Sequence, residues 1–248
     1  MLRIENLCVT IKKKEILKNI KLNVKRNKIT VILGKNGSGK STLISCINQM
    51  RKYEGDIYWK EQPWRNYSPK ERGRHIGILP QILATPHIKA EELVRMGRNP
   101  YLRMGEGYKA EDLAQVDRAM KIMGITDLKG CYVNEMSGGE RQKVYLAMIV
   151  AQDTEMLILD EPATYLDVEY QAEFMATLKN LKEVYGKTIL IVMHDLNQAV
   201  EYGEHIIVLK EGEVLFDGGK ELCLKNEVIE HAFGVRKYQS DGKTFFAP

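Results

Sequence analysis

The stretch Gly34-Lys35-Asn36-Gly37-Ser38-Gly39-Lys40-Ser41-Thr42 decides the fold of this chain. It matches the pattern G-x-x-x-x-G-K-[S/T], a turn whose backbone N–H groups converge on phosphate oxygens. Residues 29–33 before it are apolar, as in a buried parallel strand, and residues 43–49 after it can continue as a helix. Together they predict a nucleotide site, with Lys40 at the β- and γ-phosphates and Ser41 at Mg²⁺.

The composition is that of a folded protein with an ordinary core. The chain has 248 residues, of which 44% are hydrophobic and 28% charged. Its net charge of +4 is too small to indicate a nucleic-acid partner. Residues 12–28, however, carry eight Lys or Arg and one Glu. They predict a solvated strand edge whose lysines oppose aggregation, or alternatively a surface that attracts ATP or an anionic membrane.

Cysteine spacing and apolar runs limit the class of protein further. Cys8, Cys46, Cys131 and Cys223 lie far apart without a C-x-x-C pair, which argues against a zinc site and a disulfide framework. The chain start does not resemble a signal peptide, and the longest apolar run, 144–151, is too short to span a membrane. We therefore expect a soluble protein that acts at a membrane only by docking to it.

The order of strand and helix patterns predicts an α/β fold. Antiparallel strands are expected at 2–10 and 20–26, and apolar strands or hairpin strands at 56–59, 75–81, 156–159, 188–193, 205–210 and 213–217. Amphipathic helices are expected at 110–123 (with Leu113 on the apolar face), 140–152 and 168–184. We predict a P-loop NTPase core with a mostly parallel sheet, an N-terminal antiparallel β subdomain and an inserted helical subdomain. One domain would cover 1–248, with its core at 1–83 and 152–218, helical subdomain at 84–151 and tail at 219–248.

A second element of the site follows a buried strand. Four apolar residues lead into Asp160 and Glu161, and open α/β sheets bind ligands at this end of their strands. Asp160 is expected to hold Mg²⁺ through its water shell, and Glu161 to polarise the attacking water or accept its proton.

Gln81 and His194 also end apolar strands. Alone, such residues are more often a solvated loop residue and a structural hydrogen bonder. Parallel strands, however, bring their carboxyl ends to the edge that carries the phosphate loop. Gln81 is therefore expected to touch Mg²⁺ or the attacking water, and His194 the γ-phosphate.

The stretch Met136-Ser137-Gly138-Gly139-Glu140-Arg141-Gln142 predicts a second anion-binding turn, since a serine and two glycines stand at a helix start. The alternative is an ordinary serine N-cap.

These residues resemble the ATP-binding cassette (ABC) ATPases over essentially the whole chain. Met136 to Gln142 looks like the family signature, with Met where Leu is usual and Glu where Gln is common. The resemblance implies that two copies pair head-to-tail, that Ser137, Gly138 and Gly139 hold the γ-phosphate of ATP bound to the other copy, and that 163–167 pass between the two sites. ATP binding would close this dimer, and hydrolysis with Glu161 as base would reopen it. At the position usually occupied by an adenine-stacking aromatic stands Ile11, so we expect aliphatic contact instead.

The resemblance assigns the site residues as follows. The residues expected at ATP are Ile11, Gly34, Lys35, Asn36, Gly37, Ser38, Gly39, Lys40, Ser41, Thr42, Gln81, Ser137, Gly138, Gly139, Glu140 and Asp167. Those expected at Mg²⁺ are Ser41, Gln81 and Asp160, and those expected in catalysis are Glu161, His194, Gln81 and Lys40.

Three further stretches resemble the ATPases of importers for iron–siderophore complexes, haem and cobalamin, namely 67–72, 96–102 and 193–199. By this resemblance the chain works on the cytoplasmic face of the cell membrane as a peripheral subunit. It would bind an integral membrane permease, indirectly serve a substrate-binding protein, and bind no nucleic acid. The alternatives are an importer for another substrate, a soluble ABC ATPase such as one for iron–sulfur cluster assembly, and a small-molecule kinase. A kinase would leave Ser137 to Gly139 and His194 unexplained.

Overall fold

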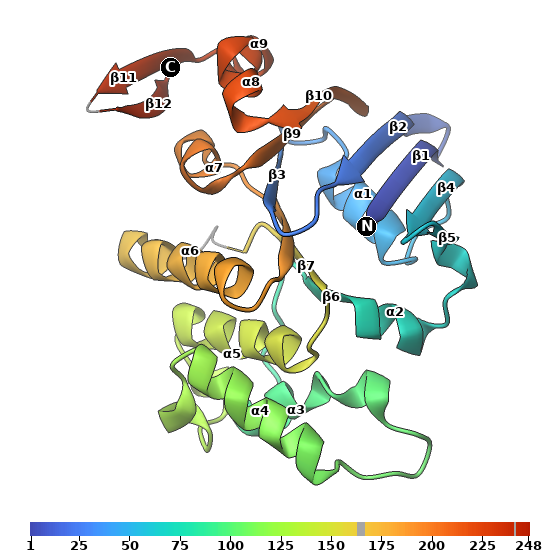
Figure 1. Cartoon of the computed structure of the whole chain (residues 1–248), viewed down its shortest axis with the longest axis vertical. Helices are drawn as coiled ribbons and strands as arrows, with labels where there is room; N and C mark the ends of the chain where they lie inside the picture. The colour runs from blue at the N-terminus through green and yellow to red at the C-terminus, as the bar shows by residue number, and fades with distance from the viewer. Residues whose placement is uncertain (163–166, 241) are drawn as a thin grey trace. The chain divides into compact units, whose positions relative to one another are not determined.

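In the computed structural model the apolar run before the phosphate loop forms strand β3 (Ile29–Leu33), and every residue of it is buried (Figure 1). The structure describes residues 1–162, 167–240 and 242–248. Their contacts group them into a first unit, residues 1–66 with 188–248, and a second unit, residues 67–187. Strand β3 and the phosphate loop belong to the first unit.

The first unit contains a mostly parallel set of strands and an antiparallel sheet. In the former, β3 pairs in parallel with β8 and β9, and β10 runs antiparallel to β9. The latter has the order β2-β1-β4-β5, with every pair antiparallel. The remaining strands of these sheets are β1 (Leu2–Ile11), β2 (Lys14–Val24), β4 (Glu54–Trp59), β5 (Gln62–Pro63), β8 (Thr188–Val192), β9 (His205–Lys210) and β10 (Glu213–Gly219).

The helices of the first unit follow the strands, and a hairpin completes its C-terminal end. Helix α1 starts directly at the phosphate loop, and α7 follows β8. The hairpin strand β12 packs on α7. These elements are α1 (Lys40–Ile47), the 3₁₀ turn η1 (Trp64–Asn66), α7 (Leu196–Tyr202), α8 (Lys220–Lys225), α9 (Val228–Phe233), β11 (Arg236–Ser240) and β12 (Lys243–Ala247).

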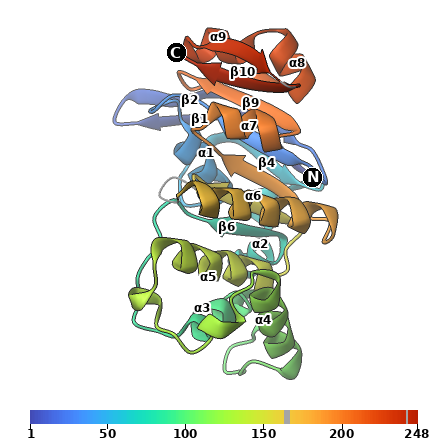
Figure 2. The same cartoon turned by 90° about the vertical axis from the view of Figure 1, so that its left-hand side faces the viewer.

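The second unit combines a parallel strand pair, β6 and β7, with a group of helices. Helix α5 packs on β6, and α3, α4 and α5 pack on one another, the green part of the chain in Figure 2. The elements are α2 (Pro69–His75), β6 (Ile76–Leu79), α3 (Ala90–Met96), η2 (Asn99–Tyr101), α4 (Ala110–Ile122), η3 (Thr126–Leu128), η4 (Val133–Glu135), α5 (Gly138–Ala151), β7 (Met156–Asp160) and α6 (Val168–Glu183).

The predicted P-loop NTPase fold, with its mostly parallel strands and N-terminal antiparallel sheet, is confirmed. The strand expected at 75–81 covers only Ile76–Leu79, because His75 is the last residue of α2. Helix α2 was missed because none of its residues is buried, so it has no apolar stripe to detect. Leu113 was wrongly placed on the apolar face of α4, since 39% of its surface is exposed. The single domain and the bounds of its helical subdomain stay predictions.

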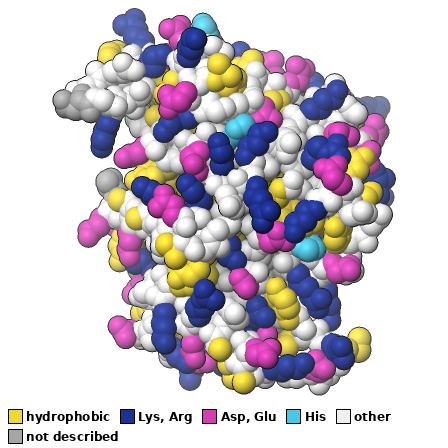
Figure 3. All heavy atoms as spheres, viewed as in Figure 1, with side chains coloured by type: hydrophobic (Ala, Val, Ile, Leu, Met, Phe, Trp, Pro, Cys, Tyr) yellow, Lys and Arg dark blue, Asp and Glu magenta, His cyan; other side chains and the backbone are white. Residues whose placement is uncertain are grey.

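The basic stretch at 12–28 includes the sheet-edge strand β2 and the turn before it. Lys12 and Lys13 form that turn, and both have a left-handed backbone. Nζ of Lys18 lies 3.6 Å from Oε1 of Glu213. On the face seen in Figure 3, basic side chains are interspersed with acidic ones. The outer position of β2 in its sheet fits the predicted solvated edge, and attraction of ATP or an anionic membrane to this stretch stays a prediction. In the part of the chain that the structure describes, none of the helices has the length and apolar character of a membrane span.

Candidate active site

The phosphate loop is a tight turn between β3 and α1 that only glycine can make at Gly39. Its φ angle is +104°, and a Cβ there would lie 2.4 Å from Cδ2 of Leu17. Leu17 belongs to β2, so the antiparallel sheet presses directly on the loop. A larger residue would have to move either the strand or the turn.

Two side chains of the loop are held in its interior. Lys40 is only 5% exposed, and its Nζ donates to the carbonyl oxygens of Gly34 at 2.8 Å and Lys35 at 3.4 Å. The ammonium group is therefore held against the loop backbone. The buried hydroxyl of Ser38 has no hydrogen-bond partner among the described residues. A buried donor and a fixed cation in a glycine-rich turn suit a phosphate group.

The sheet register brings His194 level with the phosphate loop. Ile32 of β3 lies opposite Val192 of β8, so Gly34 and His194 each stand two positions beyond this pair. The N–H of Met193 still donates to the Ile32 carbonyl at 3.2 Å. His194 itself is exposed, and Asp195 after it caps α7. His194 thus follows β8 at the edge of the sheet that carries the phosphate loop, and its contact with the γ-phosphate stays a prediction.

In the second unit, Gln81 and Glu161 are brought together by the same kind of register. Leu79 of β6 lies opposite Leu159 of β7. Two positions further on, Nε2 of Gln81 donates a hydrogen bond to Oε2 of Glu161 at 2.6 Å. Glu161 has φ +51°, a backbone conformation that is uncommon outside glycine and concentrates at functional sites. The bond fixes the direction of the carboxylate that is expected to act as the base.

The oxygen donors predicted for Mg²⁺ have the chemistry that this ion prefers. Asp160 ends β7 and is 8% exposed, and Ser41 is an exposed residue in the first turn of α1. The amide nitrogen of Gln81 donates to Glu161, which leaves its oxygen as the atom that could accept or ligate. A carboxylate, a hydroxyl and an amide oxygen fit a hard divalent cation.

The serine–glycine turn at the start of α5 is a complete capping box. Oγ of Ser137 accepts from the N–H of Glu140 at 3.3 Å, and Oε2 of Glu140 accepts from the Ser137 N–H at 2.9 Å and its hydroxyl at 2.7 Å. The hydroxyl bond, and then the N–H bond, lower the pKa of Glu140 below its usual value. Ser137 is therefore an N-cap here, the alternative that the sequence left open, and its role at ATP stays a prediction.

The two glycines of this turn have different surroundings. A Cβ on Gly139 would lie 2.9 to 3.2 Å from ring atoms of Tyr170, which belongs to α6. A Cβ on Gly138 would meet no atom of the described residues within 4 Å. Packing within the chain thus accounts for glycine at 139, whereas nothing in the described chain requires it at 138.

Comparisons with known proteins show the family to which this chain belongs. A family model described as ABC transporter matches residues 17–164. The chain belongs to the ABC transporter family. It is 36% identical to the ferric enterobactin transport ATP-binding protein FepC of Escherichia coli (strain K12), covering 95% of this chain and 88% of that protein. It is 34% identical to the petrobactin import ATP-binding protein FpuC of Bacillus anthracis, covering 94% and 87%.

A solved structure described as a dimeric bacterial ABC transporter cassette is similar as well. It is 29% identical, with a TM-score of 0.77, and the match covers 89% of this chain and 99% of that one. As an ABC cassette, this chain binds ATP and is an ATPase.

The ATP contacts expected of Asp167, of Ile11 and of the loop between the two sites stay predictions. Asp167 is exposed and caps α6, its Oδ1 accepting from the N–H of Tyr170 at 2.9 Å. Residues 163–166 of the loop expected between two ATP sites lie outside the described residues. Ile11 is the half-buried last residue of β1, and its contact with adenine stays a prediction.

A buried ion pair of the cassette was not foreseen. Nε of Arg98 donates to Asp112 at 2.9 Å, and Nη1 donates to the carbonyl of Ala151 at 2.9 Å. The guanidinium also lies 3.9 Å from the ring centroid of Tyr101, whose hydroxyl donates to the Gln152 carbonyl. The stretch 96–102, which resembles importer ATPases, thus connects α4 to the end of α5 through the hydrogen bonds of Arg98. Asp112 gave no signal because it looks like an ordinary first-turn acid of a helix.

A second unforeseen contact joins the C-terminal hairpin to α7. Oδ1 of Asn197 accepts from the N–H of Phe246 at 2.6 Å, and its Nδ2 donates to the Phe246 carbonyl at 3.5 Å. Phe246 is 7% exposed. Because Asn197 is the second residue of α7, the tail is attached close to His194. Asn197 lay in the importer-like stretch 193–199, but nothing in the sequence pointed to residue 246.

Proposed function

We propose that this chain is the ATP-hydrolysing subunit of an importer that takes up an iron complex, a siderophore chelate or haem, or cobalamin, through a separate membrane permease. The observation that carries the hydrolytic role is the 2.6 Å hydrogen bond between Gln81 and Glu161. The import of a metal complex is supported by FepC and FpuC, whose names state transport of ferric enterobactin and petrobactin. It is also supported by the importer-like stretches, two of which form the Arg98 and Asn197 contacts.

In this mechanism the phosphate loop binds the triphosphate through its backbone N–H groups and Lys40. Glu161 accepts the proton of the attacking water, and Gln81 holds the accepting carboxylate in one direction. His194, level with the loop start, contacts the γ-phosphate. Ser41, Gln81 and Asp160 would hold Mg²⁺, which supplies positive charge against the phosphate oxygens.

A second copy of the chain completes the proposed site. No described atom of its own chain lies near the Cβ position of Gly138, and the N–H groups of Gly138 and Gly139 in the first turn of α5 have no intrahelical partner. In a head-to-tail dimer these groups would contact the ATP of the other copy. The dimeric cassette that this chain resembles supports such pairing. Closure and reopening of the dimer would move the permease at the cytoplasmic face of the membrane, with a substrate-binding protein delivering the complex from the other side.

The test is recovery of the partners of tagged Glu161→Gln from native membranes in the presence of ATP, with tagged Lys40→Ala as a control that lacks the phosphate contact. A polytopic membrane protein bound to Glu161→Gln, and less so to Lys40→Ala, is the expected result. Recovery of iron–sulfur cluster assembly proteins or ribosomes in its place would overturn the importer assignment in favour of a soluble ABC ATPase.

A further inference from the structure

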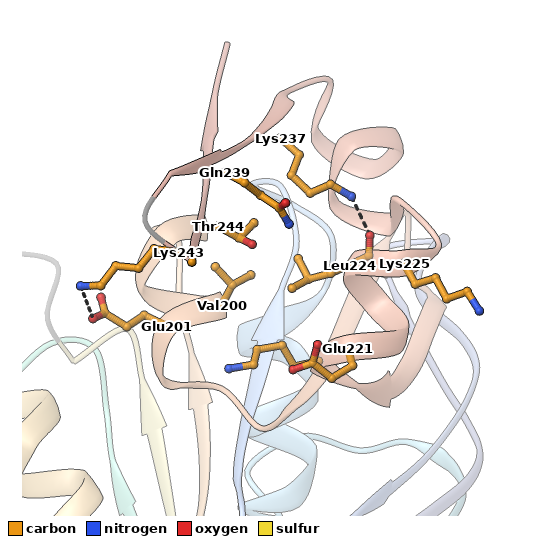
Figure 4. Close-up of a pocket in the computed structure, with 11 residues that line it drawn as sticks. Val200, Glu201, Glu221, Leu224, Lys225, Lys237, Gln239, Lys243 and Thr244 are labelled. Atoms are coloured by element: carbon orange, nitrogen blue, oxygen red, sulfur yellow. Dashed lines mark hydrogen bonds and ion pairs between the residues drawn. The ribbon is translucent and has the colours of Figure 1, made fainter.

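The C-terminal part of the first unit contains a cavity of about 600 Å³, open to solvent on one side, that the hydrolytic mechanism does not use (Figure 4). Its walls come from α7, α8 and the β11–β12 hairpin. Pockets of about 300 to 1,000 Å³ with a few convergent polar groups are the usual size of small-molecule sites. We call this space the tail cavity.

The charged groups around the tail cavity are mostly basic, with four lysines and two glutamates. One lysine is structural, because Nζ of Lys237 donates to the Leu224 carbonyl at 2.8 Å and lies 3.2 Å from Glu230. Another, Lys243, lies 4.0 Å from Glu201, and their side chains are 81% and 54% exposed. Exposed pairs of this kind are weak and are easily replaced by another anion.

The remaining two lysines are on α8. Lys220 and Lys225 have no carboxylate within ion-pair distance among the described residues. Lys220 is half-buried. The side chain of Lys225 extends away from the other lining residues in Figure 4, so the charge at the cavity that the described chain does not neutralise is that of Lys220.

The interior of the tail cavity adds apolar surface and neutral hydrogen-bonding groups. In Figure 4, Val200 and Leu224 lie in the middle of the group, with the Gln239 amide and the Thr244 hydroxyl beside them. Both polar side chains can donate to an oxyanion. An apolar centre with lysines at its border matches a small carbon skeleton that carries several negative groups.

We propose that the tail cavity binds a small polyanion, a molecule with two or more carboxylate or phosphate groups. Lys220 of α8 and Lys243 of β12 contact its oxyanions, while Gln239 and Thr244 donate hydrogen bonds to them. The ligand would join α7 to the hairpin in addition to the Asn197–Phe246 contact. This site is separate from the phosphate loop and does not depend on what the transporter carries.

The test is an NMR titration of the full chain saturated with ADP, so that the phosphate loop is already filled. Citrate is the carboxylate probe and pyrophosphate the phosphate probe. We expect one of them to shift the amide signals of Gln239 and Thr244, and the tighter of the two identifies the oxyanion. Absence of shifts at both residues with both probes would overturn the proposal.

Two charge reversals locate the site. Lys220→Glu is expected to weaken probe binding about tenfold, a change of about 1.4 kcal/mol. Lys179→Glu, at an exposed position of α6, is the matched control and should leave the affinity unchanged. Equal affinities of both variants would place the probe elsewhere and contradict the proposal. If Lys220→Glu fails to fold, Lys243→Glu at an exposed position replaces it, with the same expected loss.

Discussion

Nε2 of Gln81 lies 2.6 Å from Oε2 of Glu161, and both residues stand two positions beyond Leu79 and Leu159, which face each other across a parallel strand pair. Each residue alone is a polar side chain after an apolar strand. The register of β6 and β7 brings the two side chains together, so that the Gln81 amide holds the Glu161 carboxylate. The backbone of Glu161 itself is left-handed. This relationship is the structural basis for assigning Glu161 as the base.

Glu161→Gln should reduce ATP hydrolysis about 10²- to 10⁴-fold, the usual contribution of a general base. ATP affinity should change little, because the phosphate loop makes the binding contacts. Single-turnover hydrolysis and equilibrium binding of ATP measure the two effects separately. Glu183→Gln, at an exposed position of α6, is the control and should turn over like the unaltered chain. Normal turnover in Glu161→Gln would show that another group takes the proton.

Gly138→Ala and Gly139→Ala should impair different properties, the first ATP hydrolysis and the second the stability of the fold. At 139 the new Cβ meets the Tyr170 ring, so we expect a loss of about 1–3 kcal/mol in the free energy of unfolding. At 138 the new Cβ meets no atom of the described residues, so stability should be kept while ATP hydrolysis falls, because the ATP of the proposed partner copy would occupy that space. Thermal unfolding and ATPase rates distinguish the two. Full activity of Gly138→Ala would argue against contact with the second copy's ATP.

Asn197→Ala should loosen the C-terminal hairpin. It removes the acceptor of the Phe246 N–H, and an unsatisfied buried donor costs about 1–3 kcal/mol. Amide hydrogen exchange at residues 243–247 should therefore accelerate. Asn197→Asp keeps an acceptor oxygen and should restore most of the protection. Equal exchange in all three chains would mean that packing of Phe246 alone holds the hairpin.

The Arg98–Asp112 pair should make the stability of the chain depend on acid pH. Burial acts to raise the pKa of Asp112, but hydrogen bonds from the Lys109 N–H and Arg98 outweigh it, so the pKa lies below its ordinary value. A carboxylate with a lowered pKa stabilises the fold above its unfolded pKa of about 3.9, and this contribution is lost as pH falls further.

Asp112→Asn should therefore be less stable than the unaltered chain near neutral pH. The difference between their free energies of unfolding should become smaller below about pH 4. Arg98→Met leaves a buried carboxylate without its partner and should cost about 3–5 kcal/mol. Thermal unfolding from neutral to acid pH tests both variants. A gap between Asp112→Asn and the unaltered chain that stays constant across this range would show that Asp112 titrates normally.

Local patterns predicted the parts of this protein whose chemistry is encoded in consecutive residues. The phosphate loop, the buried strands, Asp160 and Glu161 could all be located in this way. The long-range pairs could not be, because they depend on register and on which helices pack together. Gln81 and Glu161 meet through β6 and β7, Gly139 meets Tyr170 across two helices, and Asn197 meets Phe246 across the first unit. Helix α2 was not predicted because none of its residues is buried, so its sequence has no hydrophobic period.

Uptake of labelled iron complexes by cells tests the central claim most directly. Cells that depend on this chain would receive it unaltered, as Glu161→Gln, or as the control Glu183→Gln. They would then be offered ⁵⁵Fe-loaded siderophores and haem, and labelled cobalamin. The account predicts that uptake of one compound is lost with Glu161→Gln and kept with the unaltered chain and Glu183→Gln. Equal uptake of all compounds with Glu161→Gln and the unaltered chain would contradict the assignment of this ATPase to their import.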